Sequence, residues 1–216
     1  VLEVQKRVVP EKQGNSGLDE VALMKDGAVL ICLMEPHQSQ ELIEALANKN
    51  ITAFSMELLP RITRAQTMDT LSSQSNLAGY KAVLEAAHAF GRAFPMMMPA
   101  AGTVPPAKCL VMGAGVAGLQ AIATARRLGA VVSASDVRPA AKENVESLGA
   151  SFVAVQDEEF KQAETAAGYA KEMSDEYKAK QSELIASTVA KQDIVICTAL
   201  KHDRPAPVLV REDMKK

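Results

Sequence analysis

Three glycines near the middle of the chain have the spacing of a turn that binds phosphate groups. Gly113, Gly115 and Gly118 follow the apolar run CLVM directly, and an alanine-rich helical sequence opens at Val116. The first glycine suits a tight turn, the second lets a pyrophosphate approach the backbone, and the third permits close helix–strand packing. The amides and dipole of the helix N-terminus would hold the anion. Strand, glycine turn and helix together predict a dinucleotide-binding site.

An acidic residue at the end of the second strand-like run predicts which dinucleotide binds. Asp136 closes the run AVVSASD, about 20 residues beyond the glycine turn, and Val137 and Arg138 follow it. A carboxylate here accepts hydrogen bonds from both ribose hydroxyls and repels a 2′-phosphate, which favours NAD(H) over NADP(H). A nearby arginine is how NADP proteins hold that phosphate, but beside Asp136 we expect Arg138 to pack over the adenine or to face solvent.

A second group of polar side chains precedes a helical sequence. The segment PRITRAQTMDTLSSQSNLAGY covers residues 60–80 and gathers charged, amide and hydroxyl side chains, namely Arg61, Arg64, Gln66, Asp69, Ser72, Ser73, Gln74 and Asn76. By composition alone this is a solvated loop in which Ser72 or Ser73 caps the following helix.

The apolar patterns on either side of these motifs predict an α/β protein with parallel sheets. Residues 39–50 have the period of an amphipathic helix, with Leu42, Ile43, Leu46 and Ala47 on one face. The other predicted elements before residue 100 are strands near residue 2, at 28–34 and at 51–56, a loop at 13–19, and a helix at 73–94 that ends before Pro95. Its apolar face is marked by residues that recur at three and four positions: Leu77, Tyr80, Leu84, Ala87, Phe90 or Gly91, and Phe94.

The rest of the chain continues the alternation of strands and helices. Residues 96–108 contain three prolines and should form irregular chain, and we expect the methionine triplet there to pack between lobes. Over 108–155 we predict strand, helix, strand, helix and strand. A loop at 163–168, a helix at 174–191 and a strand at 193–200 should follow. The last strand is almost wholly apolar, which suits a sheet covered on both faces. The expected fold is two Rossmann-like lobes with doubly wound parallel sheets: residues 1–72, a connecting helix at 73–95, and a dinucleotide-binding lobe at 96–216.

Composition excludes several other classes of protein. The formal net charge is −2 and aromatic residues make up 4% of the chain with no Trp, which argues against a nucleic-acid partner. No apolar run approaches the roughly 20 residues that span a bilayer. Cys32, Cys109 and Cys197 are far apart in apolar runs, so we expect buried, reduced thiols. No metal-ligand spacing links the three histidines, so no metal site is predicted.

Several strings resemble the NAD(H)-binding component, domain I, of the proton-translocating NAD(P) transhydrogenases, over essentially the whole chain. They are PRITRAQTMD, LSSQSNLAGYKAV, AAGTVPPAK, GAGVAGLQAIATARRLGA, DVR, AGYAKEM and ICTAL. The resemblance implies hydride transfer between NADH and NADP⁺, with NADP(H) on a partner component and a membrane-spanning component that couples the exchange to proton movement. It also implies a homodimer on the cytoplasmic face of the membrane.

The resemblance also implies roles for individual residues. Arg61, Gln66, Asp69 and Ser72 would surround the nicotinamide and its ribose. Tyr169 would belong to a mobile segment that closes over the nucleotide, and Thr198, Ala199 and Leu200 would lie beside the cofactor. Hydride transfer needs two nicotinamide rings held face to face without water, so none of these side chains has to act as an acid or a base.

Two departures from the family pattern leave alternatives open. The family has a Pro-Gly turn after TAL, whereas residues 201–204 read KHDR, and His202 there fits a solvated loop. The chain also starts at Val1 within a strand-like run and stops at Lys216, so we expect a fragment that lacks outer strands. Alanine dehydrogenase shares the architecture and is the main alternative. A non-catalytic NAD-binding module is the other.

Overall fold

The computed structural model describes residues 19–60, 62–155, 157, 160, 174–199 and 208–214. The chain divides into two compact units, Val1–Gln74 and Ser75–Lys216, and each is described by itself. The strand expected near residue 2, most of the loop expected at 13–19 and the loop expected at 163–168 lie outside the described residues.

The first unit contains a two-stranded parallel sheet with a helix between its strands. The elements in order are α1 (Glu20–Leu23), β1 (Val29–Cys32), α2 (Gln40–Asn48) and β2 (Thr52–Ser55), and Val29 lies opposite Thr52. The core is small and aliphatic: Val21, Met34, Leu42, Leu46 and Ile51. Both strands and the helix were predicted. The predicted helix face was only partly right, since Ala45 packs against this core while Ala47 is exposed.

The polar segment forms short helical turns that lead into the longest helix of the described residues. Two 3₁₀ helices, η1 (Met56–Leu58) and η2 (Thr63–Met68), precede α3 (Thr70–Phe90). Gly91 has a φ of 70° and ends α3, so the prediction that the helix continues to Phe94 was wrong. Glycine commonly terminates helices in this way because it adopts a positive φ without steric cost.

The face that α3 buries also differs from the prediction. Leu77 and Tyr80 are 57% and 44% exposed, whereas Gly79 and Val83 are buried. A Cβ placed on Gly79 would overlap the carbonyl group of Ala117, so the missing side chain lets the two backbones approach. The helix therefore packs through the face that contains its smallest residue, Gly79. The prediction gave weight to the larger apolar side chains instead.

The second unit is built on a four-stranded parallel sheet in the order β5-β4-β3-β6. The strands are β3 (Lys108–Met112), β4 (Val131–Ser135), β5 (Ser151–Phe152) and β6 (Ile194–Cys197), and the helices between them are α4 (Val116–Arg127), α5 (Ala141–Ser147) and α7 (Asp175–Val189). β4 and then β5 lie on one side of β3, and β6 lies on its other side. The carboxyl end of β3 is thus a topological switch point, where ligands bind in open α/β sheets.

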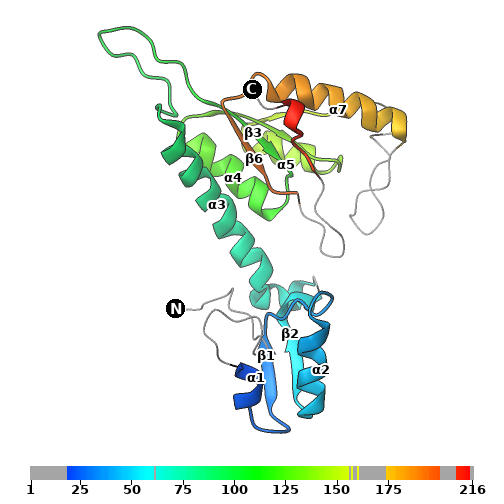
Figure 1. Ribbon diagram of the computed structural model, residues 1–216. Coiled ribbons are helices and arrows are strands. Elements are labelled where there is room, and N and C mark those ends of the chain that lie inside the picture. The colour runs from blue at the N-terminus through cyan, green and yellow to red at the C-terminus, as the bar shows by residue number, and fades with distance from the viewer. Residues whose placement is uncertain are drawn as a thin grey trace. The chain divides into compact units, whose positions relative to one another are not determined.

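Helices cover both faces of this sheet (Figure 1). Cys109 and Val111 of β3 belong to one cluster with α3, α4 and α5, while Leu110 and Met112 belong to another with α7. Alternate residues of a strand point to opposite faces, so the run from Cys109 to Met112 is apolar at every position. The prediction of a sheet buried on both sides is confirmed.

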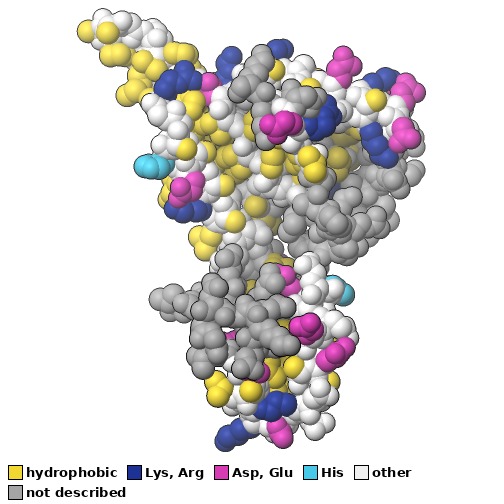
Figure 2. Space-filling view, in the orientation of Figure 1, with side chains coloured by type: hydrophobic (Ala, Val, Ile, Leu, Met, Phe, Trp, Pro, Cys, Tyr) yellow, Lys and Arg dark blue, Asp and Glu magenta, His cyan; other side chains and the backbone are white. Residues whose placement is uncertain are grey.

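The loop between α3 and β3 carries an isolated β-bridge, and one of the three cysteines departs from expectation. Met97 pairs with Val104 in an antiparallel bridge, and each methionine of the triplet is at least half exposed on this loop (Figure 2). The packing of the triplet between lobes stays a prediction, because the two units are described separately. Cys109 is buried, and burial raises its pKa to about 12. Cys197, the last residue of the edge strand β6, is exposed, so its predicted burial was wrong. No helix in the described part of the chain is long and apolar enough to cross a membrane.

Candidate functional site

The glycine turn lies at the switch point of the second sheet. The Gly113 amide donates to the Ser135 carbonyl at the end of β4 at 2.8 Å, and the Thr198 amide donates to the Met112 carbonyl at the same distance. The turn is therefore tied to both neighbouring strands at once. Its residues then open α4, with Gly115 at the N-cap.

The three glycines differ in the space around them. Gly113 has a φ of 105°, and a Cβ there would lie 2.8 Å from both the Ala199 amide nitrogen and the Thr198 hydroxyl oxygen. A Cβ on Gly118 would overlap the Gly113 carbonyl, which turns back over α4. A Cβ on Gly115 would meet nothing within 4 Å. The first and third glycines are thus required by the fold, while the middle one leaves the open space that a pyrophosphate needs.

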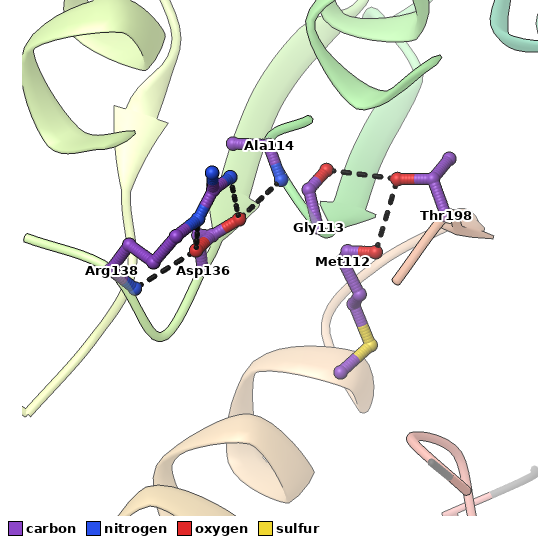
Figure 3. Close-up of polar contacts among 6 residues, drawn as sticks. All are labelled: Met112, Gly113, Ala114, Asp136, Arg138 and Thr198. Carbon is purple, nitrogen blue, oxygen red and sulfur yellow. Dashed lines mark hydrogen bonds and ion pairs between the residues drawn. The ribbon is translucent and has the colours of Figure 1, made fainter. Parts of the chain in front are cut away.

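Thr198 holds the turn from the end of β6. Its Oγ1 donates to the Gly113 carbonyl at 2.9 Å and lies 3.4 Å from the Met112 carbonyl (Figure 3). Sequence reasoning placed Thr198 beside the cofactor through the family resemblance and did not predict this hydrogen bond. A hydroxyl directly after a buried strand, at the edge that carries a glycine turn, is the signal that was available.

Asp136 is the most strongly bound side chain of the site. Its Oδ2 accepts from the Ala114 amide at 2.7 Å, its Oδ1 accepts from the Arg138 amide at 2.9 Å, and the Arg138 guanidinium donates to both oxygens at 3.0 Å (Figure 3). The carboxylate is 7% exposed. Burial acts to raise the pKa of Asp136, but the hydrogen bonds from Arg138 and from the Ala114 amide outweigh it, so the pKa is lowered. The ionised form is the one the site stabilises.

The structure corrects the expectation for Arg138. We expected its side chain to lie over the adenine or in solvent, but it folds back onto Asp136 and is only 35% exposed. In the sequence, Asp136 favours NAD(H), whereas an arginine nearby is a feature of proteins that bind NADP(H). Residues two apart after a strand end are close enough to pair, and a bidentate guanidinium–carboxylate contact is a strong one.

The other predicted cofactor-binding residues are only partly described. Val116 and Val137 are 43% and 50% exposed beside the turn and Asp136, respectively. Ala199 is half-buried against Gly113. Tyr169 and Leu200 lie outside the described residues.

The polar segment of the first unit has a different local structure from the predicted one. The Asp69 carboxylate, and neither Ser72 nor Ser73, caps α3: it accepts from the Ser72 amide at 2.9 Å and from the Ser72 hydroxyl at 2.6 Å. Aspartate at this position satisfies an amide of the first helical turn that has no partner within the helix. Gln66 lies exposed on η2, and Arg61 is outside the described residues.

The second unit is a Rossmann-type unit whose switch point has the glycine turn and terminal carboxylate of the dinucleotide-binding class. The family model Alanine dehydrogenase/PNT, N-terminal domain, matches residues 8–78, and Alanine dehydrogenase/PNT, C-terminal domain, matches residues 82–216. The chain belongs to the alanine dehydrogenase/PNT family, whose members bind NAD(P) nucleotides.

Individual relatives place the chain within that family. It is 59% identical over 214 residues to an NAD(P) transhydrogenase subunit alpha of Rhodospirillum rubrum, a match that covers 99% of this chain and 55% of the relative. The crystal structure of transhydrogenase from Sinorhizobium meliloti superposes with a TM-score of 0.80 at 59% identity, over 90% of this chain and 51% of that one. The chain thus spans about half the length of the relatives it matches.

An L-alanine dehydrogenase structure superposes less closely. Its TM-score is 0.67 at 24% identity, over 90% of this chain and 48% of that one. This similarity shows the shared fold alone. Its identity to this chain, 24%, is well below the 59% of the transhydrogenase structure.

Proposed function

We propose that this chain is the NAD(H)-binding part of a proton-translocating NAD(P) transhydrogenase. The observation that carries the proposal is the identity of 59% over nearly the whole chain with a transhydrogenase alpha subunit. The geometry of the second unit supports the NAD(H) assignment. The open space at Gly115 fits a pyrophosphate, and Asp136 is a carboxylate at the end of β4, where this class of fold binds the adenosine ribose.

The chemistry of hydride transfer comes from the nicotinamide rings, of which the bound NADH supplies one and NADP⁺ on a partner component the other. The chain's own residues bind and orient. The turn from Gly113 to Gly118 and the N-terminus of α4 hold the phosphates, and Asp136 holds the ribose. Arg61, Gln66, Asp69 and Ser72 are proposed to contact the nicotinamide and its ribose, and Tyr169 to close over the nucleotide.

The partners belong to the same proposal. A separate component would hold NADP(H), and a membrane-spanning component would couple the exchange to proton movement on the cytoplasmic side of the membrane. The chain itself would form a homodimer. The exposed methionine triplet on the loop before β3 is an apolar surface suited to such an association, since large apolar patches commonly mark protein–protein contacts.

Nucleotide titration tests the proposal first. NADH should bind at least about tenfold more tightly than NADPH, because Asp136 repels a 2′-phosphate, and intrinsic NADH fluorescence measures both affinities. Equal affinities would overturn the assignment. The protein combined with its NADP(H)-binding partner should then transfer hydride from NADH to an NADP⁺ analogue. Reduction of NAD⁺ that depends on L-alanine would favour alanine dehydrogenase, and binding with no transfer at all would favour a non-catalytic module.

A substitution in the polar segment tests the proposed division of labour. Gln66→Asn shortens an exposed amide side chain by a single methylene and should slow hydride transfer by about tenfold or more while NADH affinity changes little, because positioning matters more for transfer than for binding. The same change at Gln38, exposed in the turn after β1, is the matched control. A loss of NADH affinity with normal turnover of the bound fraction would contradict the role of Gln66.

A further inference from the structure

The carboxylate of Asp136 has no acceptor site left for a ribose hydroxyl. Each carboxylate oxygen accepts two hydrogen bonds: Oδ1 from the Arg138 amide and from its Nε, and Oδ2 from the Ala114 amide and an Arg138 terminal nitrogen. A carboxylate offers about four such sites in all. The 2′ and 3′ hydroxyls of an adenosine ribose can therefore bind only if two of the four donors leave.

The four donors are not equally replaceable. Two are backbone amides, one in the glycine turn and one directly after the strand, and the fold fixes both. The other two belong to one guanidinium on a flexible stem, which is 35% exposed while the carboxylate is 7% exposed. The guanidinium also resembles the ribose diol in form, since both present two adjacent donors, one for each carboxylate oxygen.

We propose that the Arg138 guanidinium occupies the position of the adenosine-ribose diol in the nucleotide-free protein and is displaced when the nucleotide binds. This inference rests on the proposed binding of NAD(H) to the second unit. Before binding, Arg138 keeps the buried carboxylate ionised, balances its negative charge and holds its orientation. On binding, two hydroxyl donors replace two N–H donors. Arg138 is thus a positioning residue that sets how much the ribose contributes to affinity.

A specific energetic consequence follows for ligands that lack one hydroxyl. When the 2′ hydroxyl is missing, the guanidinium retains its bond to the carboxylate, so the loss is softened. Without the guanidinium, the same missing hydroxyl leaves a buried, charged oxygen with its backbone amide donor alone, which is more unfavourable. The penalty for 2′-deoxyribose should therefore be larger in a variant that lacks the Arg138 donors.

The test compares ADP with 2′-deoxy-ADP by isothermal titration calorimetry in the purified protein and in Arg138→Met. The ratio of the two dissociation constants is the readout, because the attraction between a positive charge and the diphosphate affects both ligands equally and cancels. We expect the ratio to be about tenfold larger in Arg138→Met than in the wild type. Arg127→Met removes the same charge from an exposed position at the end of α4 and should leave the ratio unchanged.

Arg138→Lys provides a second, milder variant. A lysine ammonium replaces one of the two side-chain hydrogen bonds at most in the same geometry, so the ratio should lie between the other two. An identical ratio in wild type and in whichever variants fold would overturn the inference, whatever the absolute affinities. Failure of the wild type to bind either ADP or NADH would instead overturn the proposed function. The two results are therefore distinguishable.

Discussion

The glycine turn and the polar segment before α3 differ in how their side chains and backbone are held. Hydrogen bonds of 2.7–2.9 Å join the turn to Asp136 and Ser135 on one side and to Thr198 on the other. In the polar segment, Asp69 and Ser72 bond to each other, whereas Gln66 lies exposed on a 3₁₀ helix. Hydrogen bonds within the fold therefore hold the first region throughout, while the second combines a bonded pair, Asp69 and Ser72, with the exposed Gln66.

This difference matches the different tasks proposed for the two regions. An anchor for phosphate and ribose has to be rigid before binding, so its residues carry out structural roles that distances record. Groups that orient a reactive ring acquire their contacts when the ring arrives, and exposed side chains on short turns suit that task. The proposed roles in the polar segment accordingly rest on sequence similarity, and those in the turn rest on geometry as well.

The largest expected effect separates two glycines of the same turn. Gly118→Ala should lower the free energy of unfolding by about 3 kcal/mol, because the added Cβ overlaps the Gly113 carbonyl and the gain in helix propensity is smaller. Gly115→Ala should cost less than about 1 kcal/mol, because its Cβ meets nothing within 4 Å. Thermal or urea unfolding monitored by circular dichroism measures both values.

NADH affinity should give the opposite order when corrected for folding. Gly115→Ala places a methyl group where the pyrophosphate would approach, so affinity should fall by about tenfold or more in a protein of nearly normal stability. Normal NADH binding in Gly115→Ala would show that the open space is not the phosphate site. Normal stability in Gly118→Ala would show that the fold tolerates a side chain there. The proposed contrast between the crowded Gly118 and the open Gly115 would then be wrong.

A smaller effect is expected at Thr198, which ties the turn to β6. Thr198→Val keeps the shape of the side chain but leaves the Gly113 carbonyl without the hydroxyl donor at 2.9 Å, so stability should fall by about 2 kcal/mol and NADH affinity with it. Thr198→Ser keeps the hydroxyl and should restore most of both. If Thr198→Val and Thr198→Ser were equally stable, the hydroxyl would not hold the turn.

Much of the second unit could be predicted because its strands are buried on both faces. Continuous apolar runs such as Cys109–Met112 and Ile194–Cys197, separated by helical periods, leave few alternatives to a parallel sheet. The glycine spacing then located the switch point. These features depend on local sequence and on burial, which a single chain records directly.

The errors arose at three contacts, one tertiary and two local, that the sequence pattern did not single out. Gly79 lets α3 approach Ala117, so the buried stripe follows the smallest residue and leaves Leu77 exposed. Asp69 was assigned only to the nicotinamide, although it lies three residues before the amide that it caps. Arg138 was expected over the adenine or in solvent, although its position two residues after Asp136 lets it pair with that carboxylate. Sequence spacing permitted each contact without selecting it.

The smallest expected effect compares two residues of the polar segment. Asp69→Ala removes the cap of α3 and should lower the free energy of unfolding by about 1 kcal/mol, whereas Gln66→Ala, on the exposed face of η2, should change it by less than about 0.5 kcal/mol. Urea unfolding at fixed pH resolves the difference. If the two variants were equally destabilised, Gln66 would belong to the fold like the glycine turn. A stable Gln66→Ala protein would show that the fold does not require this side chain, unlike Asp69.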